Sequence, residues 1–218
     1  MRKTWWKILG AVLIIYTAIA GLLLDVPKLD ILNETIRNLY FHVPMWFTMI
    51  VLFSISIYYS TRSLITKSEE DDLRAVESIN VGIIFGILGI VTGAFWAKYT
   101  WGEYWSSDPK QNFAAIALLL YFAYLILRNS IDEDQKRAKI SSIYNIFAFP
   151  MMVVLLFVLP RLQASLNPGN GGNPRFNCYD LDSRMRAVFY PACIGWIIIG
   201  YWIYSIRIRI RSLENKKF

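Results

Sequence analysis

Two short stretches of the sequence contain side chains that could hold a flat ligand carrying a metal ion. The stretch KYTWGEYWSSDPK, at 98–110, contains Trp101, Gly102, Tyr104, Trp105 and Asp108. The stretch RNLYFHVP contains His42, which is the only histidine of the chain. Aromatic rings stack on flat apolar molecules, and a neutral imidazole nitrogen is a common ligand of transition metals. The two stretches form one site only if the fold brings them to the same side.

A third segment, 161–186, is unusual for its positive charge. It contains four arginines, Arg161, Arg175, Arg184 and Arg186, together with Asp180 and Asp182. Ion pairs with these carboxylates would account for two of the arginines, whereas a site for an anionic ligand would use the guanidinium groups directly. A haem suits all three segments, because its macrocycle stacks on aromatic rings, its iron takes an imidazole and its propionates pair with arginines.

Six apolar segments must position these side chains. They are 5–24, 43–61, 78–97, 112–127, 140–160 and 187–206. A membrane-spanning helix needs about 20 apolar residues, and continuous apolar runs exclude the alternating strands of a membrane barrel. Only 18% of the residues are charged, compared with about a quarter in soluble domains. We therefore expect an all-α, polytopic membrane protein with six transmembrane helices, forming a single six-helix domain over residues 1–218.

The distribution of Lys and Arg predicts the orientation of these helices. The two tails and the segments 62–77 and 128–139 together hold 15 of the 23 cations, whereas 25–42, 98–111 and 161–186 hold eight. Cytoplasmic loops are enriched in Lys and Arg, so both termini are expected in the cytoplasm and the three candidate segments outside. The same bias accounts for the net charge of +7, and nucleic acid is not needed as a partner.

Two features of the apolar segments affect the site. Gly82, Gly86, Gly89 and Gly93 follow one another at spacings of four, three and four. They form one helical stripe that a neighbouring helix can approach closely. This predicts a stiff base for the stretch 98–110, which we call the aromatic loop. Pro44 disfavours a regular helix directly before it, so His42 is expected at the mouth of the second span and outside a helix interior.

Both stretches resemble those of a known family. WGEYWSSDPKQ resembles the tryptophan-rich WWD signature, Trp-Gly-x-x-Trp-x-Trp-Asp, of the haem-handling proteins of cytochrome c maturation. RNLYFHVP is similar to their first outer segment, in which a histidine precedes Val-Pro. Six spans with cytoplasmic termini resemble the haem-presenting CcmC family, while the CcsA-type haem-attachment proteins share the signature, often followed by Asp-Pro-Lys as at 108–110.

The resemblance implies a set of roles for individual residues. His42 would be the axial ligand of the iron of haem b, which is bound as cargo. The remaining residues of the implied site are Trp101, Gly102, Tyr104, Trp105 and Asp108 of the signature, with Arg161 and Arg184 for the propionates. Asp108 is expected to cap the turn or orient the loop through backbone amides, because its charge would repel the negative edge of the haem.

The sequence departs from the signature in two ways. Ser107 stands in place of the third tryptophan, and the family's second histidine is missing. The segment 161–186 offers Asn167 and Met185 instead. Three explanations are open: the haem is five-coordinate, a partner supplies the sixth ligand, or tight retention of haem has been lost.

The resemblance also implies a function and partners. The protein would present haem at the periplasmic face of the cell inner membrane and hand it to a CcmE-like periplasmic haem chaperone. ABC-type Ccm subunits and membrane lipid would be its other partners, and no covalent bond would be made. The alternative is an enzyme, the membrane subunit of a CcsA-type cytochrome c synthetase.

Overall fold

The protein is built from long helices. In the computed structural model of the chain, residues 4–27, 32–163, 165–166 and 181–214 are described. The long helices are α1 (Trp5–Leu23), α2 (Leu39–Thr66), α3 (Glu69–Trp101), α4 (Pro109–Asn129), α5 (Asp134–Val153) and α6 (Ser183–Glu214). A 3₁₀ turn, η1 (Asn33–Asn38), precedes α2, while a π turn, η2 (Val154–Val158), and a 3₁₀ turn, η3 (Leu159–Arg161), continue α5. All six are long and apolar enough to cross a membrane, as predicted.

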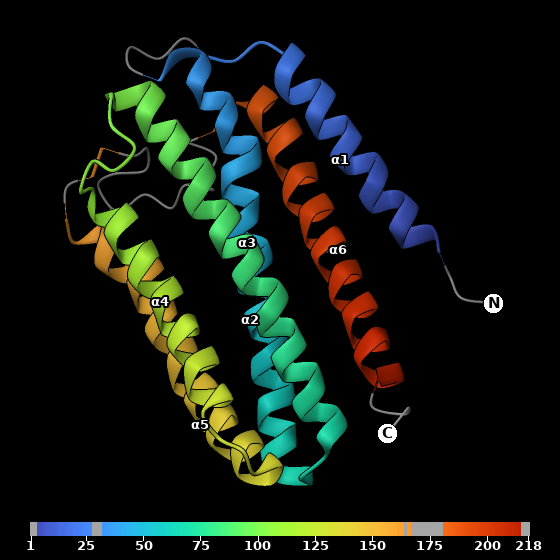
Figure 1. The fold of residues 1–218 in the computed structure, drawn as a ribbon. Coiled ribbons are helices and arrows are strands. Elements are labelled where there is room, and N and C mark those ends of the chain that lie inside the picture. Colours follow the sequence, from blue (N-terminus) through green and yellow to red (C-terminus); the bar gives the residue numbers. More distant parts are fainter. Residues whose placement is uncertain (1–3, 28–31, 164, 167–180, 215–218) are drawn as a thin grey trace.

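The helices are arranged around a central pair. Figure 1 shows α2 and α3 side by side, with α1 and α6 on one flank and α4 and α5 on the other. The start of α2, the end of α3 and the start of α4 lie at one end of the bundle, which we call the aromatic end because it contains His42 and Trp101. The opposite end, where α2 meets α3 and α4 meets α5, contains Asp72 and Arg128 and is called the ionic end.

The glycine stripe of α3 sets how closely α2 and α3 approach. Starting at the ionic end, Gly82, Gly86, Gly89 and Gly93 face Phe53, Met49, Trp46 and His42 of α2, in that order. A Cβ added at any of these glycines would lie only 2.4 to 2.8 Å from an atom of the facing side chain. Each step along α3 is therefore matched by an equal step back along α2, and the predicted close packing is confirmed.

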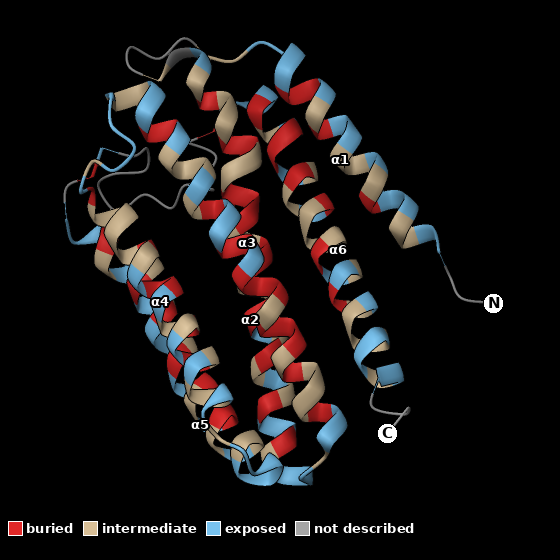
Figure 2. Cartoon of the chain, viewed as in Figure 1, coloured by how far each residue is buried: buried red, intermediate tan, exposed pale blue. Residues whose placement is uncertain are grey.

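Burial follows this central pair. In Figure 2 the buried residues concentrate along α2 and α3, while the outer flanks are largely exposed. Phe53 and Tyr121, both fully buried, stack with their ring centroids 3.6 Å apart. On α1, by contrast, large apolar side chains such as Ile8, Val12 and Ile15 are exposed. An apolar exterior of this kind suits contact with lipid chains, which do not penalise exposed hydrocarbon.

The start of α2 corrects one expectation. Pro44 is buried inside the helix, which already begins at Leu39, so the helix does precede the proline and His42 lies in its first turn. Proline is tolerated in membrane helices where neighbouring groups satisfy the backbone groups that it releases. One turn later, the Thr48 hydroxyl also donates to the Pro44 carbonyl at 2.8 Å. His42 is consequently carried by a regular helix and held more rigidly than a loop would hold it.

Candidate functional site

The imidazole of His42 lies in a half-buried pocket between α2 and α3. It packs edge-to-face against Trp46, with ring centroids 6.3 Å apart, and against Trp96, at 5.8 Å. Its Nδ1 is 3.1 Å from the Thr92 hydroxyl oxygen. The backbone of Gly93 lies beneath the ring, since a Cβ added there would be 2.7 Å from the imidazole Cε1. Two indoles, one hydroxyl and one glycine thus fix the position of the ring.

Hydrogen bonds from η1 secure this pocket. The Trp96 indole N–H donates to the Thr35 hydroxyl at 3.3 Å, and Asn38 Nδ2 donates to the Thr92 carbonyl at 3.0 Å. Thr35 also pairs with the Thr100 hydroxyl at 3.1 Å. The turn before α2 is therefore attached to the last turns of α3, and both sides of the histidine pocket move together.

The aromatic loop begins at a glycine C-cap. Trp101 is the last residue of α3, and Gly102 follows with φ of +89°, in the left-handed region that favours glycine. The Gly102 N–H donates to the Lys98 carbonyl at 3.1 Å, while the Lys98 ammonium donates to the Gly102 carbonyl at 2.8 Å. The same ammonium lies 5.5 Å from the centre of the Tyr104 ring. Gly102 thus allows the chain to leave α3 abruptly and lay Tyr104 over Lys98.

The rest of the loop folds back on the first turn of α4. The Gln111 side-chain oxygen accepts from the Ser106 N–H at 3.0 Å, and the Trp105 indole N–H donates to Asn112 Oδ1 at 3.0 Å. These bonds hold the polar edges of the loop against the protein. Tyr104 is 52% exposed and Trp105 is 40% exposed. Large aromatic surface therefore remains accessible to a ligand on a loop with a defined shape.

Asp108 joins two of the three segments. Its carboxylate is buried, with the residue only 3% exposed, and it caps α4 by accepting from the Lys110 N–H at 2.8 Å. It also accepts from the Ser165 hydroxyl, at 3.0 Å to Oδ1 and 2.8 Å to Oδ2, and from the Leu166 N–H at 2.6 Å. The expectation that Asp108 caps the turn is confirmed. We call this set of bonds from 165–166 the Asp108 clasp.

The Asp108 clasp limits how far Arg161 can lie from the aromatic loop. Arg161 is exposed, at the end of η3, and forms no ion pair with a described carboxylate. It precedes Ser165 by four residues, which span at most roughly 14 Å. Its guanidinium is therefore held in the neighbourhood of the loop.

The other arginines of segment 161–186 differ from Arg161. Arg184 forms an ion pair with Asp182, with Nε 3.2 Å from Oδ1. The hydrogen bonds from the Arg184 backbone N–H and side chain lower the pKa of Asp182. The Nε of Arg186 is buried and has no hydrogen-bond acceptor among the described groups. Arg175 and Asp180 lie outside the described residues.

The predicted histidine, in α2, packs against the last turns of α3, from which the signature begins. Trp96, which packs against His42, precedes Trp101 by five residues, or about 7.5 Å along a helix axis. Met185 is buried within a cluster that includes Trp96 and Val188, so it serves the core. Asn167 lies outside the described residues. His42, the aromatic loop and Arg161 therefore share the aromatic end, on the segments that the sequence pointed to.

Several residues of the site escaped the sequence analysis. Thr92 contacts His42, Ser165 contacts Asp108, and Trp46 covers the imidazole. Thr92 could have been noticed, because it is a polar residue inside an apolar segment and adjoins the last glycine of the stripe. Nothing local distinguishes Ser165, whose partner is 57 residues away.

A groove elsewhere on the surface has different chemistry. The groove, of about 400 Å³, lies between α2 and α6 and is lined by Val51, Ser54, Ile55, Tyr58, Tyr59, Tyr201 and Tyr204. Its lining includes neither an imidazole nor an arginine. The combination of an imidazole, exposed aromatic surface and a guanidinium occurs instead at the aromatic end.

Comparison with known proteins gives one match over most of the chain and others over part of it. The family model CcmC, described as Heme exporter protein C, matches residues 1–214. A cytochrome c biogenesis protein CcsA of Prochlorococcus marinus subsp. pastoris is 46% identical over 90 residues, which is 39% of this chain and 29% of the relative. A CcsA protein of Synechococcus sp. is 33% identical over 90 residues, 41% of this chain and 30% of the relative. The chain thus spans less than a third of the length of these curated relatives.

Proposed function

Because the chain belongs to the CcmC family of heme exporter proteins, we propose that it binds haem b as cargo for cytochrome c biogenesis. The observation that carries this proposal is that His42, held by Thr92 and Trp96, lies at the same end of the bundle as an exposed aromatic loop. The protein presents haem for transfer and itself makes no covalent bond.

Each residue of the site has a role in this proposal. His42 is the axial ligand of the haem iron, and Trp101, Tyr104 and Trp105 contact the macrocycle. Gly102 permits the turn that aims the loop, and Asp108 holds the loop in place through the Asp108 clasp. The propionates pair with Arg161 and Arg184. Arg161 forms no ion pair with a described carboxylate, whereas Arg184 would share its guanidinium with Asp182.

The coordination that follows is incomplete within this chain. His42 is its only histidine, so a second imidazole must come from a partner or be absent. Loose coordination suits a carrier, because the iron must be released when the haem is transferred. We propose a CcmE-like periplasmic haem chaperone as the recipient, with ABC-type Ccm subunits and membrane lipid as the other partners.

The proposal includes a topology. The chain forms one six-helix domain over residues 1–218 in the cell inner membrane, with both termini in the cytoplasm and the aromatic end in the periplasm. A cysteine introduced at Ser106 should react with a membrane-impermeant maleimide in spheroplasts, and a cysteine at Ser130 should not. Labelling of the cysteine at position 130 alone would indicate the opposite orientation, and equal labelling at both positions would contradict the proposed topology.

A spectroscopic experiment tests the function directly. Purified protein in detergent is titrated with haem b, and the absorption spectrum is recorded for the wild type and for His42→Ala. We expect the wild type to bind haem without a bis-histidine low-spin spectrum. His42→Ala should lose the axial bond and keep only weak binding through stacking and ion pairs. An unchanged spectrum and affinity in His42→Ala would show that His42 is not the ligand.

A CcsA-type synthetase is the second candidate function. The Asp-Pro-Lys sequence at 108–110 and the similarity to CcsA proteins over 90 residues favour it. The two candidates differ in their partners, since a carrier binds a haem chaperone and a synthetase subunit binds a larger subunit and an apocytochrome. Co-purification from the membrane distinguishes them by the protein that is retained.

A further inference from the structure

The hydroxyl of Thr92 lies between the imidazole and the backbone of its own helix. Its oxygen is 2.7 Å from the Leu88 carbonyl, 3.2 Å from the Gly89 carbonyl and 3.1 Å from His42 Nδ1. Thr side chains in helices commonly donate to the carbonyl four residues earlier. The shortest of the three contacts is of this type, which places the single hydroxyl proton on the side of Leu88.

The position of that proton determines what His42 must do. A hydroxyl has one proton to donate and two lone pairs to accept with. With its proton directed to Leu88, the Thr92 oxygen presents a lone pair to Nδ1. A hydrogen bond at 3.1 Å then requires a proton on Nδ1, because two lone pairs facing each other would repel.

We propose that Thr92 is a positioning residue that fixes His42 as the tautomer protonated on Nδ1, with its lone pair on Nε2. In a neutral imidazole one nitrogen donates and the other accepts, and the partner of the first decides which nitrogen can bind a metal. Partners of this kind also orient the ring and make the ligating nitrogen more basic. The part of the inference that concerns haem rests on the proposed function. The part that concerns the tautomer does not depend on it.

Gly93 supplies the second half of the arrangement. A Cβ at this position would lie 2.7 Å from Cε1, 3.2 Å from Nδ1 and 3.5 Å from Nε2 of His42. The ring edge that carries both nitrogens therefore rests on bare backbone, and Trp46 and Trp96 flank the ring. Thr92 selects the nitrogen, while Gly93 and the indoles hold the plane in which it points.

A tautomer measurement on haem-free protein tests the first claim. Because the chain has one histidine, ¹⁵N-labelled histidine gives one pair of ring nitrogen signals. Spectra are recorded at about pH 8.5, about two units above the ordinary histidine pKa. We expect the Nδ1–H tautomer in the wild type and in Thr92→Ser, which keeps the hydroxyl. Thr92→Val, of similar shape but without an acceptor, should lose that preference. A wild type protonated on Nε2, or an unchanged tautomer in Thr92→Val, would overturn the proposal.

Haem titration tests the second claim. Removing the partner of a metal-binding histidine typically weakens binding 10- to 100-fold, so Thr92→Val should weaken haem binding about tenfold and Thr92→Ser by less than about threefold. Gly93→Ala should also weaken binding, whereas Gly86→Ala on the same stripe meets Met49 and Leu118 and should not. If Thr92→Val changes the tautomer without changing haem affinity, the positioning of His42 stands and its role as haem ligand fails.

Discussion

The two ends of the bundle use charged residues in opposite ways. At the ionic end, buried carboxylates and arginines are paired with each other across helices. At the aromatic end, arginine groups remain without a described acceptor beside exposed aromatic rings. The paired charges of the ionic end connect helices, whereas the aromatic end is where we propose that a ligand binds.

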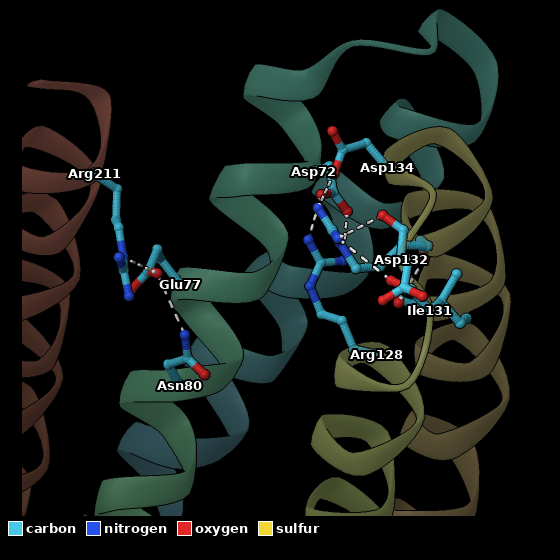
Figure 3. A network of polar contacts seen from close by, with 10 residues as sticks. Asp72, Glu77, Asn80, Arg128, Ile131, Asp132, Asp134 and Arg211 are labelled. Atoms are coloured by element: carbon cyan, nitrogen blue, oxygen red, sulfur yellow. Dashed lines mark hydrogen bonds and ion pairs between the residues drawn. The ribbon is translucent and has the colours of Figure 1, made fainter. Parts of the chain in front are cut away.

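The carboxylates of the ionic end are largely buried and closely paired. Asp72 of α3 accepts two hydrogen bonds from Arg128 of α4, at 2.9 and 2.5 Å (Figure 3). Glu77 lies 2.5 Å from Arg207 and 3.5 Å from Arg211 of α6, and also accepts from Asn80. Figure 3 shows Glu77 and Asp72 directed to opposite sides of α3. These pairs connect α3 to both flanks of the bundle.

The aromatic end contrasts in its arginines. The Nε of Arg186 is buried without a described acceptor, and Arg161 is exposed without a described carboxylate partner. A buried donor left without an acceptor costs free energy, about 1–3 kcal/mol. Such a group is tolerated where a ligand supplies the missing acceptor. Under the proposed function, stability and ligand binding depend on different ends of the bundle, and four substitutions test that separation.

The largest effect is expected from breaking a pair at the ionic end. Asp72→Ala leaves Arg128 largely buried without its partner, and losing one member of a buried pair typically costs about 3–5 kcal/mol. Thermal unfolding in detergent should show this loss, while haem bound per folded molecule stays unchanged. The matched control is Glu70→Ala, whose pair with Arg74 is exposed and should contribute about 0.2–1 kcal/mol. Equal effects of the two substitutions would contradict the importance assigned to burial.

An intermediate effect is expected at Asp108, where structure and binding overlap. Asp108→Ala removes a helix cap, worth about 1 kcal/mol, and charge-assisted hydrogen bonds worth about 1.5–3 kcal/mol. Both the unfolding temperature and the haem affinity should fall. Asp108→Asn can still cap α4, so its unfolding temperature and haem affinity should lie between those of Asp108→Ala and the wild type. Reduced stability with full haem affinity would mean that the Asp108 clasp only supports the fold.

A smaller effect on binding alone is expected in the aromatic loop. Trp105→Ala removes one stacking contact, worth about 1 kcal/mol, which corresponds to about fivefold in affinity. Trp5→Ala is the control, because Trp5 is also exposed but lies at the start of α1. Haem titration of the two variants measures the difference in affinity. Equal affinities would indicate that the aromatic residues of the loop only anchor the protein at the membrane–water interface.

The smallest effect is expected from a single exposed arginine. Arg161→Gln should weaken haem binding about two- to threefold at low salt, because exposed ion pairs contribute less than about 1 kcal/mol. Salt should reduce the difference from the wild type. Arg137→Gln, at the ionic end and already paired with Asp134, should leave haem binding unchanged. A salt-independent effect of Arg161→Gln would argue against direct pairing with the propionates.

The sequence predicted the elements of this fold because lipid imposes strong local rules. Apolar length alone located six spans, and the glycine spacing of α3 located a close helix contact. The capping role of Asp108 was expected because its charge would repel the negative edge of a haem, and the residue directly precedes α4. Each of these inferences depends on residues close together in the chain.

The sequence could not predict contacts that join distant residues. The third span was expected to begin at residue 78, whereas α3 begins at Glu69. The charges of Asp72 and Glu77 placed these residues before the apolar segment. In the structure they belong to α3 and pair with Arg128 and Arg207, which lie 56 and 130 residues away. Ser165 was missed for the same reason, since its partner Asp108 is 57 residues away.

The Asp108 clasp also imposes an order on the assembly of the protein. His42 and Thr92 can meet as soon as α2 and α3 have been inserted, because both belong to that hairpin. Asp108 must wait until the ribosome has added another 57 residues, since Ser165 follows α5. A nascent chain therefore brings His42 and Thr92 together early and completes the attachment of the aromatic loop late. A chain arrested after α4 would hold the loop only by its bonds to α3 and α4, without those from 165–166.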